Sequence, residues 1–231
     1  EATIVRTCKK LGYQGYYHLK IALAKEVINP DNSYPDNTDF TDITSLATFL
    51  LKKQAEDLIQ STQFFNAEVL ESILKLLANC DTIFFFAAGN SNPLAVYGAY
   101  KFSQLGLKTV VHVSPEMQIN AAYSMGKRDL AIGISNSGST NLMVDIFKVV
   151  KERGAKSVCI TNYIKSPLSK LSTHQLNTAV SDKIFFEAFD STRVPAMGVI
   201  DMLVLLFMYK NKAHYEKYRT REEFLGSRFK G

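Results

Sequence analysis

One short segment of the chain concentrates the chemical groups that bind phosphate. Ser135-Asn136-Ser137-Gly138-Ser139-Thr140 offers four hydroxyls, an amide and a glycine. It follows a buried-strand pattern and precedes a helical one, so its hydroxyls would lie beside the free backbone amides of a helix N-terminus, where anions bind. No lysine follows the glycine, as it does in nucleotide-binding loops. The segment therefore favours a phosphate monoester, while the same residues would also suit a simple helix cap after a polar turn.

A second polar loop, Gly89-Asn90-Ser91-Asn92-Pro93, also lies between an apolar strand pattern and a helix. Gly89 permits close backbone approach, and Pro93 suits the first turn of a helix. By itself this loop does not specify a ligand. Its place after a strand puts it at the edge where parallel sheets bind their ligands.

The elements that must position these loops alternate between strands and helices. Strand patterns are expected at 82–88, 108–113, 129–135, 157–161, 175–180 and 184–186, and helices at 43–62, 66–79, 94–105 and 140–153. Apolar strands separated by helices of about 12 residues imply a parallel sheet with both faces covered. We therefore predict the α/β class, as a doubly wound, flavodoxin-like parallel sheet of about five strands flanked by helices.

Composition narrows the class of protein without naming a function. The 231 residues are 46% hydrophobic, with a formal net charge of +5 that suits anionic partners but does not demand nucleic acid. The longest apolar run, 199–208, contains Asp201 and is too short to cross a membrane. Cys8, Cys80 and Cys159 are far apart and odd in number, which favours free structural thiols over a disulfide or a metal site. We expect a cytoplasmic protein without membrane contact, metal or cofactor.

The central part of the chain resembles a known family. Residues 129–162, with Ser-Asn-Ser-Gly-Ser-Thr at their centre, are similar to the core motif of SIS (sugar isomerase) domains, and the likeness extends over about residues 60–210. The resemblance implies phosphate contacts from Ser135, Ser137 and Thr140, with Ser91 and Asn136 nearer the sugar. The full ligand set that we expect is Gly89, Asn90, Ser91, Ser135, Asn136, Ser137, Gly138, Ser139, Thr140 and Glu187.

The first residues of the chain carry a second resemblance. Residues 1–20 are similar to the end of the helix-turn-helix domain in RpiR-type transcriptional regulators, which combine that domain with a C-terminal SIS domain. The expected organisation is a helix-turn-helix remnant at 1–28, a polar linker at 29–42 and an SIS domain at 43–231. The resemblance implies DNA contacts from Thr3, Arg6, Lys9 and Lys10. Because the earlier helices of such a domain are not in the sequence, we expect this segment alone to have lost DNA binding.

The predicted function is transcriptional regulation of sugar metabolism, with a phosphosugar effector that modulates DNA binding. We expect no catalytic residues and a homodimer or higher homo-oligomer, formed through apolar faces at 43–79 and 193–208. The main alternative is an SIS-type phosphosugar isomerase, for which Glu187 is the best candidate base, followed by His112 and Glu116. A third possibility is a sugar-phosphate-binding subunit that regulates another protein.

Overall fold

The computed structural model describes residues 6–8, 11, 19, 42–179 and 193–229. The chain divides into two units, 1–46 and 47–231. In the first unit, Arg6 is exposed on a helical turn, whereas the predicted DNA contacts Thr3, Lys9 and Lys10 and most of the predicted linker lie outside the described residues. Glu187 and the strand expected at 184–186 also lie outside them.

The second unit contains a five-stranded sheet that confirms the predicted fold class. The strands are β1 (Ile83–Ala87), β2 (Thr109–Val111), β3 (Leu130–Ile134), β4 (Lys156–Thr161) and β5 (His174–Asn177). All pairs are parallel, and the strand order is β2-β1-β3-β4-β5. This is the flavodoxin-like order, in which the chain changes direction across the sheet between β1 and β3.

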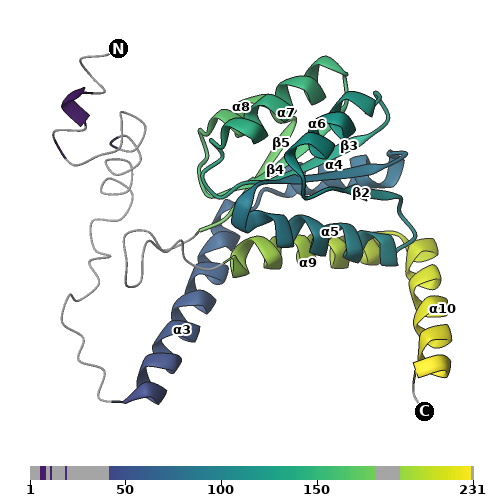
Figure 1. Ribbon diagram of the computed structural model, residues 1–231. Helices are drawn as coiled ribbons and strands as arrows, with labels where there is room; N and C mark the ends of the chain where they lie inside the picture. Colours follow the sequence, from purple (N-terminus) through teal and green to yellow (C-terminus); the bar gives the residue numbers. More distant parts are fainter. Residues whose placement is uncertain (1–5, 9–10, 12–18, 20–41, 180–192, 230–231) are drawn as a thin grey trace. The chain divides into compact units, whose positions relative to one another are not determined.

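Helices cover both faces of this sheet (Figure 1). One layer contains α4 (Ala67–Asn79), α5 (Asn92–Gln104) and α9 (Val194–Lys210), and the other contains α6 (Pro115–Ser124), α7 (Asn141–Glu152) and α8 (Pro167–Leu171). Successive side chains of β1 serve the two layers in turn, because Phe85 belongs to the core under α5 and α9 while Phe84 and Phe86 pack under α6 and α7. This alternation explains why the strand is apolar throughout.

Two further helices flank the sheet layers. Helix α3 (Ile43–Ser61) is followed by a 3₁₀ turn, η1 (Thr62–Phe64), and its Ser61 hydroxyl accepts a hydrogen bond from the Ala179 amide at 2.8 Å. Helix α10 (Lys212–Phe229) is fixed near its start by His214, whose Nδ1 lies 2.7 Å from the Leu105 carbonyl and whose ring packs on Phe207. His214 therefore has a structural role at this junction.

No single helix among the described residues is both long and apolar enough to cross a membrane. Helices α9 and α10 pass that test only when they are taken together, and the chain bends by 109° between them.

Candidate functional site

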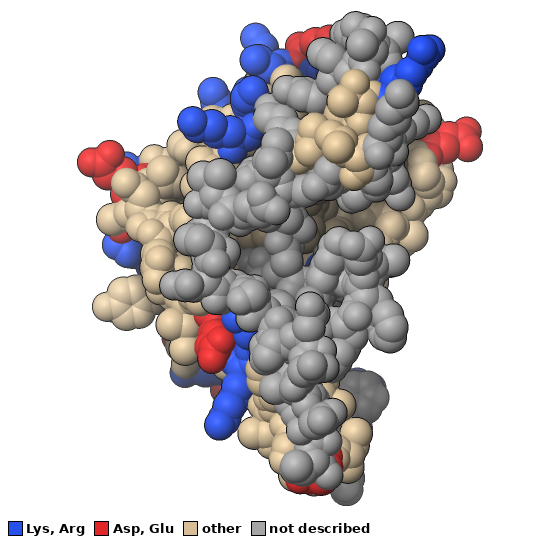
Figure 2. All heavy atoms as spheres, turned by 90° about the vertical axis from the view of Figure 1, so that its left-hand side faces the viewer, with Lys and Arg blue, Asp and Glu red and all other residues tan. Residues whose placement is uncertain are grey.

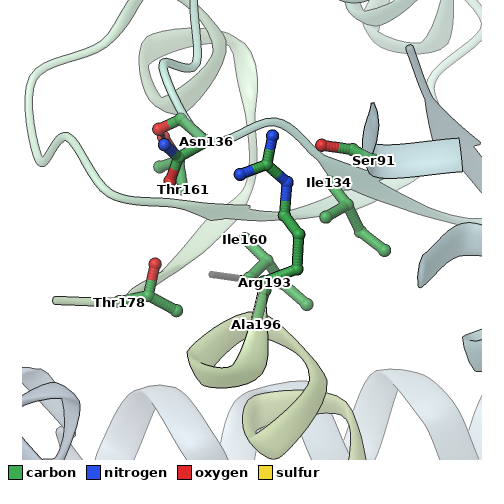
Figure 3. Close-up of a pocket in the computed structure, with 8 residues that line it drawn as sticks. All are labelled: Ser91, Ile134, Asn136, Ile160, Thr161, Thr178, Arg193 and Ala196. Atoms are coloured by element: carbon green, nitrogen blue, oxygen red, sulfur yellow. Dashed lines mark hydrogen bonds between the residues drawn. The ribbon is translucent and has the colours of Figure 1, made fainter. Parts of the chain in front are cut away.

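The two polar loops predicted from the sequence follow β1 and β3, which are neighbours in the sheet. Because the strands are parallel, both loops lie at the carboxyl edge, at the point where the strand order reverses. The first loop forms a 3₁₀ turn, η2 (Gly89–Ser91), that leads directly into α5. The second, 135–140, leads into α7. The structure therefore brings Ser91 and Asn136 to one pocket (Figure 3).

The pocket combines an apolar wall with polar side chains from five segments. Its full lining consists of Ser91, Ile134, Asn136, Ile160, Thr161, Thr178, Arg193 and Ala196. Thr161 ends β4, Thr178 follows β5, and Arg193 precedes α9. Of the predicted ligand residues that the structure describes, Ser91 and Asn136 line it. The other described ones, in 89–90, 135 and 137–140, belong to the two adjoining loops.

Backbone conformation fixes the loop at 135–140. Gly138 has φ +59°, in the left-handed region that favours glycine. A Cβ there would lie 2.3 Å from the Ser166 hydroxyl and 2.8 Å from the Thr161 hydroxyl, so the close approach also requires glycine. The Gly138 carbonyl accepts a hydrogen bond from the Leu168 amide at 2.9 Å. The loop is therefore held against the segment that joins β4 to α8.

Further hydrogen bonds secure Asn136. Its carbonyl accepts from the Asn162 amide at 2.9 Å and from the Thr161 hydroxyl at 3.1 Å. The Thr161 hydroxyl in turn accepts from the Tyr163 amide at 3.3 Å. Since these contacts come from the end of the adjacent strand β4, the loop geometry is set before any ligand arrives.

The hydroxyls of the two loops are not used as helix caps. Thr140 is the N-cap residue of α7, and Ser91 is that of α5, yet neither side chain makes a capping hydrogen bond. Two other helices do have side-chain caps, since Asn66 accepts from the Val69 amide and Ser166 from the Ser169 amide, each at 3.1 Å, whereas Ser114 at the start of α6 makes none. The simple-cap interpretation of 135–140 is therefore not supported. The first-turn amides of α7 remain open to an anion.

The first loop is held by a residue that sequence reasoning missed. Gln118 is fully buried in α6, its Oε1 accepts from the Ala87 amide at 3.2 Å, and its Nε2 donates to the Ala87 carbonyl at 2.8 Å. Strand β2 ends opposite Phe85, so Gln118 takes the place of a strand partner for Ala87. It thereby fixes the end of β1 immediately before Gly89.

The two candidate bases that the structure describes, His112 and Glu116, do not line the pocket. His112 follows β2 and Glu116 lies exposed in the first turn of α6, and neither lines the pocket. Burial, followed by the charge of Lys156, lowers the pKa of His174, which begins β5 at the opposite edge of the sheet. Glu187 stays a prediction.

The cysteines behave as structural thiols. Cys8 and Cys159 are buried, and no disulfide joins the three. Burial raises the pKa of Cys80 and of Cys159 to about 11, which suppresses the reactive thiolate. Among the described residues, no three His, Cys, Asp or Glu side chains form a group that could hold a metal ion.

Two family models match the chain. The model "SIS domain" matches residues 76–206, and the model "Helix-turn-helix domain, rpiR family" matches residues 1–30. Both agree with the resemblances seen in the sequence. The SIS match begins at the end of α4 and ends within α9, so it contains the whole sheet and both loops of the pocket.

Curated relatives and solved structures agree with these matches. An HTH-type transcriptional regulator of Caldanaerobacter subterraneus is 30% identical over 94% of this chain and 78% of its own length. One from Clostridium perfringens is 30% identical over 88% and 74%. In structure, Vibrio vulnificus NanR complexed with ManNAc-6P has a TM-score of 0.76 at 24% identity, covering 97% of this chain and 80% of that one.

The sugar isomerase domain of an RpiR transcription factor from Sphaerobacter thermophilus has a TM-score of 0.70 at 19% identity, covering 77% of this chain and 98% of that one. At these identities the structural likenesses establish the fold. The family models and the curated relatives go further: the chain belongs to the rpiR family of helix-turn-helix transcriptional regulators and contains its SIS domain.

Proposed function

We propose that the pocket at the carboxyl ends of β1 and β3 binds a sugar phosphate, and that this molecule is the effector of the regulator. The observation that carries the proposal is the uncapped start of α7 beside a preformed loop of hydroxyls. Ser135, Ser137, Gly138, Ser139 and Thr140 would hold the phosphate through hydroxyls and amides. The complex of NanR with ManNAc-6P supports this ligand class, because that protein shares the fold.

The sugar would lie toward the first loop and the pocket wall. Gly89, Asn90, Ser91 and Asn136 would face it, together with Glu187.

The DNA contacts that we propose are Thr3, Arg6, Lys9 and Lys10. The face shown in Figure 2 carries both Lys or Arg and Asp or Glu side chains among its described residues. We assign DNA binding to the helix-turn-helix domain and effector binding to the SIS domain, in line with the two family models that match the chain.

Regulation follows from thermodynamic linkage. A sugar phosphate that binds one arrangement of the regulator more tightly shifts the protein toward that arrangement, and DNA affinity changes by the same coupling free energy.

We propose that the functional unit is a homodimer. The face predicted on α4 is used inside the molecule, because Ile73, Leu74 and Leu77 are buried in the core. Helix α9 keeps Leu205 and Tyr209 exposed, and these would meet a second copy.

A thermal-shift screen of the purified chain tests the proposed ligand class. Sugar phosphates, including N-acetylmannosamine 6-phosphate, are compared with their unphosphorylated parents, and every hit is assayed for turnover. We expect stabilisation that requires the phosphate, without turnover. Isomerisation of a stabilising ligand, abolished by Glu187→Gln, would establish the enzyme instead. Binding of parents and phosphates alike would refute the phosphate site.

A further inference from the structure

The proposed phosphate loop lacks a positive charge. Residues 89–91 and 135–140 contain hydroxyls, amides and glycines but no lysine or arginine. A phosphate monoester carries close to two negative charges at neutral pH. Neutral donors and a helix N-terminus satisfy its oxygens but only partly neutralise it. Such a ligand therefore calls for a cation from elsewhere in the fold.

The lining of the pocket supplies one. Among the described side chains that line it, Arg193 is the only one with a charge. Figure 3 shows its guanidinium rising from the start of α9 and lying between Asn136 and Ser91. A guanidinium is planar and always charged, and it offers paired N–H donors that match two phosphate oxygens. Arg193 thus brings the missing charge to the place where the two predicted loops meet.

Two hydroxyl side chains lie beside Arg193 in the same pocket. Ser91 is 5% exposed and Thr178 is 2% exposed. Both side chains line the pocket beside Arg193 (Figure 3). A hydroxyl can donate one hydrogen bond and accept two, so these side chains supply neutral partners for a polar ligand beside the charge of Arg193.

The backbone of Arg193 belongs to a firmly packed element. Its carbonyl accepts the Met197 amide at 3.0 Å in the first turn of α9. The same helix buries Val199, Ile200 and Leu203 in the core. A ligand that binds the guanidinium is therefore attached to the start of a packed helix.

We propose that Arg193 is the charged contact for the effector's phosphate and connects the bound ligand to α9. The phosphate would be held by the loop at 135–140 on one side and by Arg193, next to Ser91, on the other. Ligand binding would then fix the starts of α5, α7 and α9 relative to one another. Helix α9 also carries the exposed Leu205 and Tyr209, so a sugar phosphate at Arg193 would act on the proposed dimer surface. This inference depends on the proposed sugar-phosphate function.

Substitution of Arg193 tests the inference by isothermal titration with inorganic phosphate and N-acetylmannosamine 6-phosphate, and with any sugar phosphate that the screen identifies. We expect Arg193→Gln to weaken phosphate-dependent binding by roughly 10- to 100-fold, since a charge-assisted hydrogen-bond pair is lost. Arg193→Lys should retain part of the affinity because it keeps the charge but not the paired donors. The matched control is Lys210→Gln, which removes a charge from the opposite end of α9, where Lys210 pairs with Glu71 at 2.8 Å.

Hydrogen exchange of the 194–200 backbone separates a ligand contact from a merely structural role. In the unmodified chain, ligand should slow exchange there, and in Arg193→Gln this protection should be lost while exchange without ligand stays the same. Equal affinities in Arg193→Gln and Lys210→Gln would refute the role of Arg193 and leave the phosphate loop intact. Failure of the unmodified chain to bind any phosphorylated probe would overturn the proposed function itself.

Discussion

Replacement of Gly138 by alanine should damage both stability and ligand binding. The residue has φ +59°, a conformation that costs an L-residue about 1–2 kcal/mol. The added Cβ would also lie 2.3 Å from the Ser166 hydroxyl and 2.5 Å from the Ser166 Cβ, and Ser166 is buried. Overpacking of this kind costs about 1–3 kcal/mol. We therefore expect Gly138→Ala to lower the free energy of unfolding by about 2–5 kcal/mol.

The chain offers a control that isolates the steric part of this loss. Gly89 has nearly the same φ, +55°, but a Cβ built there meets nothing within 4 Å. Urea unfolding should therefore show a loss of only about 1–2 kcal/mol for Gly89→Ala. The difference between the two variants measures the contact with Ser166. If both lose the same free energy, the loop at 135–140 is not packed against the β4–α8 segment as described.

Three other outcomes are expected. Ser137→Ala combined with Thr140→Ala should weaken a sugar phosphate by about 2–4 kcal/mol in titration calorimetry with little change in urea midpoint, and normal binding would show that the phosphate lies elsewhere. Gln118→Leu should cost about 2–4 kcal/mol of unfolding free energy, because the buried backbone groups that it pairs become unsatisfied; a loss below about 1 kcal/mol would refute its positioning role. Cys80 and Cys159 should resist alkylation at pH 8 in the folded protein, and fast labelling of both would contradict their burial. Burial raises each pKa from 9.0 to about 11. The free energy of unfolding that they contribute is therefore fully present below about pH 9 and should be lost as the pH rises through 11.

The strands were readable because burial on both faces makes a continuous apolar run. The pattern predicted 129–135, and β3 occupies 130–134. Helix α6 was missed because its buried face consists of Gln118, Ala121 and Ala122, which give no apolar stripe. Helix α10 was missed for a related reason, since it is strongly polar and charged along its length. Helix α8 has only five residues, which is too short for a period to show.

The hydroxyl-rich loops were recognisable because their residues are contiguous and follow strands. Arg193 and Thr178 gave no such signal. Thr178 lies inside the strand expected at 175–180, and Arg193 ends a short polar run at 190–193. They come from different segments that the fold brings to the pocket. Glu187, the remaining predicted ligand residue, and the DNA contacts Thr3, Lys9 and Lys10 lie outside the described residues and stay predictions.

The α/β class, the family and the loop at 135–140 could be predicted from the amino acids alone, because each depends on neighbouring residues: an apolar run, a motif, a cluster of hydroxyls. The folded chain was needed to see that Ser91, Asn136 and Arg193 share a pocket, and that the hydroxyls of Ser91 and Thr140 leave their helices uncapped. These features depend on strand order and helix packing, which involve residues far apart in the chain. Parallel pairing of β1 with β3 places the loop ends together, and burial of α9 fixes the residue that begins it.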